Sequence, residues 1–356
     1  MQGFTAHQLQ FTCEVQTPIL LNEHQGSAIR GALFHALRRQ FCYDKKARGC
    51  GECALWATCP ICFLVATRNP QSGRGTEVPR PYTIEPPLKR MGESANQRRG
   101  EPASERISES ASRRGDVRRS ATSSTWFYES GEILEFGLTI FARALDLFPY
   151  VVLGSKSLER EGLGKRLRSE NGDWRRGTFA IREIAAVNRL SGERQSVMCQ
   201  EDSLVSVPDR PVTHQQVLAR AEQLPSDVIT LIFKTPSRII ERGKLERRPT
   251  FRPLIQRLHG RLRALTGEFS DHPWEFDFRE VMAQAEAVQV VEDHTRWEDL
   301  DSYSTRLRRA TPRGGFIGRV TFAGDLEPFL PWLVWGEVVH VGKDAVKGNG
   351  WMRIGE

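Results

Sequence analysis

The sequence predicts an α+β fold made of two tandem ferredoxin-like domains, each with the element order β-α-β-β-α-β. Three observations lead to this prediction. The chain has 356 residues, enough for two domains that each bury a core. Each half opens with a strand that is followed by a helix. A unit in the middle of the chain recurs loosely at its end, and such a repeat sets the architecture.

The repeated unit consists of a strand, a short apolar helix and a glycine turn that carries lysine. In the late copy the strand covers 314–322, the helix 325–333 and the glycine loop 342–350. The same parts of the early copy fall at 135–141, 145–152 and 162–165. We therefore expect two similar domains, each presenting a basic glycine loop.

The N-terminal domain is expected over residues 1–220. Alternating apolar residues predict a first strand at 8–16, and a helix follows at 28–41. A proline-bounded segment at 78–87 is expected to be one arm of an edge hairpin. Further predicted parts are a cysteine-rich insertion at 42–66, an insertion at 89–124 and a strand at 178–184. The insertion at 89–124 is poor in large apolar residues, so it is predicted to be disordered.

The C-terminal domain is expected over residues 225–356. Its first strand is predicted at 228–234, followed by a basic loop that contains Arg242 and Lys244. A helix rich in arginine is predicted from 251 to 265. A strand at 287–291 and the late copy of the repeat complete the domain.

Charge points to a polyanionic partner. Lysine and arginine number 51 against 44 acidic residues, which gives a net charge of +7 and a pI near 9.2. The excess is mainly arginine, whose planar fork pairs with phosphate, so a nucleic acid is favoured over a merely basic surface. The sequence has no run of 18 apolar residues and no secretory signal at its start. We expect a cytoplasmic protein with no membrane contact.

Four cysteines form two Cys-x-x-Cys pairs, Cys50 with Cys53 and Cys59 with Cys62. Four thiolates at this spacing predict a structural zinc ion, although the gap between the pairs is short for a zinc ribbon. An iron–sulfur cluster fits the same ligands, and Cys42 is an alternative ligand. Disulfides are disfavoured in a cytoplasmic chain. A closed four-cysteine site leaves no open position, so this metal is not expected to take part in catalysis.

Four stretches of the chain resemble a known family. They are 29–33 (IRGAL), 233–236 (FKTP), 303–306 (YSTR) with 314–318 (GGFIG), and the terminal loop of Gly342, Gly348 and Gly350. With these motifs the chain resembles the CRISPR-associated precursor-crRNA-processing endoribonucleases, the Cas-six family of the RAMP superfamily. The resemblance implies tandem ferredoxin-like domains, binding of CRISPR repeat RNA and metal-independent cleavage without a catalytic cofactor. Attack by the ribose 2′-hydroxyl would leave a 2′,3′-cyclic phosphate and a 5′-hydroxyl.

Histidine is the residue best suited to such a reaction, because it exchanges protons near neutral pH. His35 is predicted to point away from the apolar face of the first helix, with Arg38 at i+3 and Arg39 at i+4 beside it. The family's catalytic histidine commonly lies on or just after this helix, which supports His35. His340 is the alternative, because it precedes the terminal glycine loop, and His24 is a weaker third candidate. Some relatives cleave without histidine, so Lys343 and Tyr303 stay open.

The RNA-binding residues are expected to be cations and loop glycines, since glycine lets backbone N–H groups turn toward a phosphate. They are Arg30, Arg38, Arg39, Lys165, Arg242, Lys244, Arg306, Lys343, Lys347, Gly342, Gly348 and Gly350. The primary hypothesis is an endoribonuclease that processes precursor crRNA. The alternative is a non-catalytic crRNA-binding subunit that joins other proteins in a CRISPR effector complex.

Overall fold

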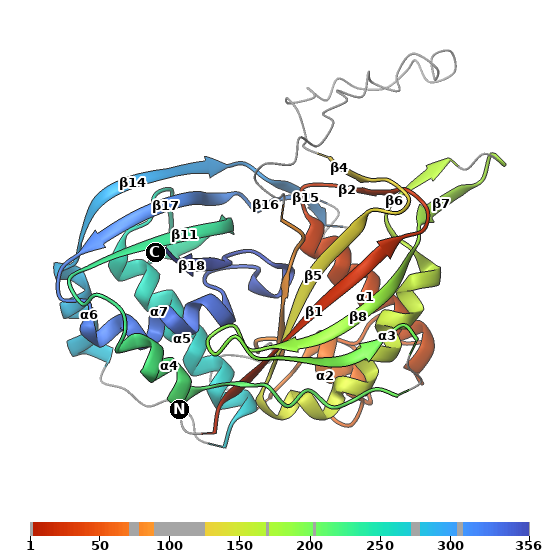
Figure 1. The fold of residues 1–356 in the computed structure, drawn as a ribbon, viewed down its shortest axis with the longest axis horizontal. Helices are drawn as coiled ribbons and strands as arrows, with labels where there is room; N and C mark the ends of the chain where they lie inside the picture. Colours follow the sequence, from red (N-terminus) through yellow and green to blue (C-terminus); the bar gives the residue numbers. More distant parts are fainter. Residues whose placement is uncertain are drawn as a thin grey trace, which may run out of the picture.

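The computed structural model describes residues 3–70, 78–88, 125–168, 171–201, 204–271, 278–304 and 309–355. Two antiparallel sheets stand next to each other, and helices cover a face of each sheet (Figure 1). The predicted insertion at 89–124 lies outside the described residues.

The first sheet has the strand order β3-β5-β1-β8-β9. Counted along the chain, its strands β3, β5, β1 and β8 follow the 2-3-1-4 order of a ferredoxin-like sheet. The extended arm predicted at 78–87 contains β3, which lies at the sheet edge, as expected. The elements of this half are β1 (Thr5–Val15), β2 (Ile19–Leu21), α1 (Gln25–Phe41), α2 (Pro60–Ala66), β3 (Tyr82–Glu85), β4 (Trp126–Tyr128), β5 (Ile133–Phe141), α3 (Phe148–Glu161), β6 (Leu163–Arg168), β7 (Trp174–Gly177), β8 (Phe179–Val187), β9 (Arg194–Cys199), β10 (Val212–Thr213) and α4 (His214–Ala221).

The second sheet has the order β14-β17-β11-β18, which repeats the 2-3-1-4 arrangement. The two sheets therefore share their topology, as the sequence repeat predicted. The elements of this half are β11 (Val228–Ser237), β12 (Ile239–Glu241), β13 (Lys244–Glu246), α5 (Phe251–Phe269), α6 (Phe278–Ala287), β14 (Gln289–Glu298), β15 (Asp301–Ser304), β16 (Arg309–Pro312), β17 (Gly315–Ala323), α7 (Leu330–Val339), the short 3₁₀ turn η3 (Ala345–Lys347) and β18 (Met352–Ile354).

Helix α1 follows from the spacing of its apolar residues. Ile29, Leu33, Ala36 and Leu37 are buried on one face, at the i, i+4, i+7, i+8 spacing of an amphipathic helix. The helix begins at Gln25, three residues before the predicted start. The reason is a tertiary contact: a Cβ on Gly26 would lie only 2.1 Å from the backbone oxygen of Lys347, so a glycine is needed there.

Each sheet has its own hydrophobic core, but the second core extends beyond the predicted domain boundary. Phe4 just before β1, Phe141 at the end of β5 and Val217 of α4 pack with the core of the second half. The predicted division near residue 220 stays a prediction. Within the described part of the chain, helices long and apolar enough to span a bilayer are absent.

Candidate RNA-binding and catalytic site

His35 lies on the exposed face of α1, opposite the buried face of that helix. Its ring contacts the ring of Phe34, with the two centroids 5.2 Å apart. Arg39 lies one turn further along and is 72% exposed in its side chain. The structure therefore presents the predicted histidine and one predicted arginine on the same open helical face.

The three arginines of α1 differ in what they contact. Arg38 donates to the backbone oxygens of Ala47 and Arg48, so it fastens the cysteine-rich segment to the helix. Arg30 donates to the backbone oxygen of Val65 at 3.3 Å. Arg39 forms an ion pair with Glu161 at 3.4 Å, at the end of α3. Of these three, Arg39 is the one whose charge faces solvent.

The hairpin of β6 and β7 adds cations close to this face. Glu161, the partner of Arg39, is followed after one residue by β6, so the end of α1 lies beside the base of the hairpin. The hairpin projects away from the first sheet (Figure 1). It presents exposed Lys165, Arg166, Arg168, Trp174 and Arg176, and the tryptophan is 60% exposed. An exposed aromatic ring among arginines is typical of surfaces on which unpaired bases stack.

The terminal glycine loop joins the two halves of the molecule. Gly348 packs against Pro86 and Ile84, where a Cβ would lie 2.7 Å from Pro86 Cδ. The hydroxyl of Thr235 donates to the backbone oxygen of Gly348 at 2.7 Å. Gly350 has φ +70° and lies against Val341. These two glycines therefore allow close backbone packing.

The lysines of this loop lie in different environments. Lys347 forms an ion pair with Asp344 at 2.7 Å, and burial lowers the pKa of its ammonium group. Lys343 is exposed, and its backbone N–H donates to the oxygen of Arg238. Lys343 and Gly342 border a pocket, described next, whereas Lys347 lies against the start of α1.

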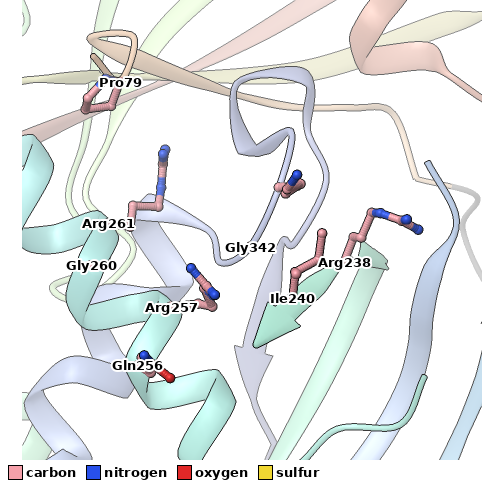
Figure 2. A pocket seen from close by; sticks show the side chains of 9 residues that line it. Pro79, Arg238, Ile240, Gln256, Arg257, Gly260, Arg261 and Gly342 are labelled. Atoms are coloured by element: carbon pink, nitrogen blue, oxygen red, sulfur yellow. The ribbon is translucent and has the colours of Figure 1, made fainter. Parts of the chain in front are cut away.

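A basic pocket lies between α5 and the glycine loop (Figure 2). Its volume is about 450 Å³. Four cations line it, namely Arg238, Arg257, Arg261 and Lys343. The other lining residues are Pro79, Ile240, Gln256, Gly260 and Gly342. Among the residues that the structure describes, none that lines this pocket carries a carboxylate.

His340 was expected to face a ligand held by the terminal glycine loop, but the structure places it in the interior. Its side chain has no exposed surface, and its ring stacks on that of Trp351 with the centroids 6.0 Å apart. Burial and the nearby charge of Arg261 hold the pKa of His340 well below its usual range. The ring of His340 is therefore closed off from solvent, whereas that of His35 is exposed.

Two of the remaining predicted residues are open to solvent. Arg242 and Lys244 are exposed at the turn between β12 and β13. The side chain of Tyr303 and the whole of Arg306 lie outside the described residues. His24 stands at the N-cap position of α1 and is half-buried, and its backbone N–H donates to the side-chain oxygen of Asn22.

The cysteines of the predicted metal site are free thiols, and several lie close together. Cys50 and Cys62 share a hydrogen bond, and Cys42 and Cys59 are near enough to influence the pKa of Cys50. Burial raises the pKa of both Cys50 and Cys62. Cys42 precedes the first Cys-x-x-Cys pair in the sequence, but in the structure it lies near Cys50. Among the described residues, no group of three or more His, Cys, Asp or Glu side chains lies close enough together to hold a metal ion.

Sequence reasoning missed the pocket arginines and the hairpin tryptophan. Arg257 and Arg261 are four residues apart in α5, a spacing that places two side chains on one helical face. Trp174 stands directly before two arginines, which was a usable signal. Arg238 could not have been assigned to the pocket, because its position depends on how the chain turns after β11.

Family models match both halves of the chain. One, described as an N-terminal domain, matches residues 4–108 and 114–210, which is more than half of the chain. A model of the CRISPR-associated endoribonuclease Cas6 matches residues 231–352. Among curated proteins, the sequence has no significant match.

Similar solved structures also include Cas6 proteins. A product complex of Thermus thermophilus Cas6 has 14% identity and a TM-score of 0.50, and the match covers 98% of this chain and 99% of that one. A partial Cas6-RT-Cas1–Cas2 complex contains a chain with 13% identity and a TM-score of 0.53. That match covers 99% of this chain but 46% of the longer one. At such identities the likeness shows the shared fold alone.

Proposed function

Because this chain belongs to the Cas6 family of CRISPR-associated RAMP proteins, an endoribonuclease family, we propose that it cleaves precursor crRNA within the repeat without a metal ion. The observation that carries the proposal is the exposed His35 on α1, beside Arg39 and the cationic β6–β7 hairpin. This arrangement offers a proton-transfer group next to positive charge, which RNA cleavage requires. The tryptophan of the hairpin adds a surface on which bases can stack.

In the proposed reaction the ribose 2′-oxygen loses its proton and attacks the adjacent phosphorus. The bond from phosphorus to the 2′-oxygen forms as the bond to the 5′-oxygen breaks, and the leaving oxygen takes up a proton. The products are a 2′,3′-cyclic phosphate and a 5′-hydroxyl. His35 is assigned the proton transfer, and Arg39 offsets the charge that develops on the phosphate.

The other sequence-predicted cations are assigned to RNA binding in two groups. Lys165 belongs to the hairpin beside α1, and Lys343 belongs to the basic pocket. Arg242 and Lys244 are open to solvent and extend the positive surface of the second half. Arg30, Arg38 and Lys347 are already bonded within the protein, so we assign them a positioning role.

The partner is proposed to be CRISPR repeat RNA, and subunits of CRISPR complexes are proposed as further partners. Support comes from the names of the similar structures: one is a Cas6 product complex, and another is a complex of a Cas6-RT-Cas1 chain with Cas2. The family match favours an enzyme over a non-catalytic crRNA-binding subunit.

A cleavage assay in EDTA tests the function. Labelled repeat RNA incubated with the protein and excess EDTA is expected to be cut at one position in each repeat. Retarded but intact RNA would contradict the enzymatic proposal and support a non-catalytic binder. The absence of any retardation or cutting at low salt would contradict both.

We further propose that the cysteine cluster binds a structural zinc ion through Cys50, Cys59 and Cys62, with Cys53 or Cys42 as fourth ligand. The supporting observation is the proximity of the thiols of Cys50, Cys59 and Cys62. Their segment packs on the first core through Cys50, Cys53, Ile61 and Cys62, and a metal ion would stabilise it further. The zinc would hold this segment in place and take no part in the chemistry.

Elemental analysis of the purified protein tests the zinc site. We expect about one zinc ion per chain, lost in Cys62→Ser together with a lower melting temperature. Cys199→Ser is the matched control and is expected to keep the metal. Comparison of Cys42→Ser with Cys53→Ser identifies the fourth ligand. Stoichiometric iron instead of zinc would indicate a cluster, and protein without either metal would contradict the site.

A further inference from the structure

The basic pocket has an imbalance of charge that a bound anion would correct. Its four cations come from the residue that follows β11, from α5 and from the glycine loop, and none of the described residues that line it is acidic. Figure 2 shows Arg257 and Arg261 extending from α5 into the space between the helix and the Gly342 segment. Positive charge gathered in a partly enclosed cavity is unfavourable unless a counter-charge enters it.

Arg261 is the most informative of these residues. Its Nε donates to the backbone oxygen of Val339, whereas its Nη2 is buried and has no hydrogen-bond partner. Burial lowers the pKa of Arg261 to about 10, so the guanidinium stays charged at neutral pH. A buried, charged donor without a partner is rare in a folded protein and points to a ligand that supplies the acceptor.

The rest of the lining indicates what such a ligand carries. Arginine forks suit the oxygens of a phosphate group, and Arg257 and Lys343 are exposed at the mouth of the pocket to pair with it. Ile240 and Pro79 provide apolar contact surface. The amide oxygen of Gln256 is buried without a partner and can accept from a base N–H. A volume of about 450 Å³ is large enough for a nucleotide.

The pocket is separate from the face that carries His35. Lys343 borders the pocket, and Lys347, four residues later, contacts Gly26 at the start of α1. His35 lies nine residues beyond Gly26, about 13 Å along the helix at 1.5 Å per residue. None of the described residues that line the pocket belongs to α1, so a group held there would not lie against His35.

We propose that this pocket binds one nucleotide of the RNA through its phosphate, as an anchor remote from the bond that is cut. The assignment to RNA rests on the proposed function. The chemistry itself is that of a phosphate ester, which a free nucleotide would also offer. The pocket would fix the register of the strand relative to His35.

Substitutions on α5 test the anchor. Arg257→Ala changes an exposed side chain, and Arg261→Lys keeps the charge but removes the fork. Arg263→Ala is the matched control, because Arg263 is exposed on the same helix and does not line the pocket. We expect Arg257→Ala and Arg261→Lys to weaken binding of repeat RNA about tenfold or more. Loss of one phosphate contact at Arg257 should also reduce the salt slope of binding by about 0.7.

Two further measurements separate the outcomes. The RNA concentration that gives half-maximal cleavage should rise in Arg257→Ala and stay unchanged in Arg263→Ala, because the anchor acts on binding. AMP, added at constant ionic strength, should raise the melting temperature of the wild type and of Arg263→Ala, but not that of Arg257→Ala. Adenosine should have no such effect.

Equal losses of RNA affinity in Arg257→Ala and Arg263→Ala would indicate general surface charge and overturn the proposal. A response to AMP with unchanged RNA affinity in Arg257→Ala would assign the pocket to a free nucleotide and overturn the RNA anchor. If the wild type fails to bind repeat RNA, the proposed function and the RNA anchor both fall. An AMP response that Arg257→Ala abolishes would then identify a free-nucleotide site.

Discussion

Replacing His35 by alanine is expected to abolish RNA cleavage while leaving RNA affinity within about twofold. Proton transfer by a positioned side chain contributes roughly 10²- to 10⁴-fold to such reactions, so the loss should lie in this range. The side chain is exposed, and its removal should not change the melting temperature. Single-turnover cleavage at saturating RNA, paired with a binding measurement, checks this expectation.

His294→Ala is the matched control for this experiment. His294 is also exposed, in the edge strand β14 of the other sheet, so its replacement should leave cleavage unchanged. His340→Ala is expected to lower stability, because it removes a buried ring stacked on Trp351. Full activity of His35→Ala, or a selective loss of activity in a folded His340→Ala protein, would contradict the site assignment.

Replacing Gly350 by alanine is expected to destabilise the protein by about 3 kcal/mol or more. Gly350 has φ +70°, and a Cβ there would lie 1.7 Å from the backbone oxygen of Val341. The residue cannot move away easily, because its N–H donates to Pro236 and its oxygen accepts from Val341. Denaturant unfolding of the variant and the wild type measures the difference.

Gly131→Ala separates steric overlap from backbone strain. Gly131 has a similar φ of +87°, but a Cβ there would meet nothing within 4 Å. Its substitution should therefore cost only about 1 kcal/mol, the strain of a left-handed alanine. Equal destabilisation by the two substitutions would show that the packing of the glycine loop contributes little.

The repeat in the sequence predicted the topology because the same order of strand, helix and glycine turn occurs in both halves. Periodicity also predicted which face of α1 is buried, and so left His35 exposed. The start of α1 was missed, since Gly26 in its first turn packs against Lys347 and Gly348 of the glycine loop. A local sequence pattern does not reveal a contact with a segment more than 300 residues away, as between Gly26 and Lys347.

The candidate site was less predictable than the fold. Nearness to Gly342 in sequence made His340 look like a loop residue, yet its φ of +62° turns the chain at the end of α7 and Trp351 covers its ring. The glycines were expected to form a phosphate nest, whereas Gly348 and Gly350 serve close backbone packing. The pocket joins Arg238, Arg261 and Lys343 from separate segments, and only the fold brings these together.

The most direct test of the account is the chemistry of the cleaved ends in EDTA. We expect products with a 2′,3′-cyclic phosphate and a 5′-hydroxyl, and no cutting of a repeat RNA that carries a single 2′-deoxy nucleotide before the scissile phosphate. Cleavage of that deoxy substrate, or a strict requirement for a divalent metal ion, would contradict the claim that the RNA's own 2′-hydroxyl is the nucleophile.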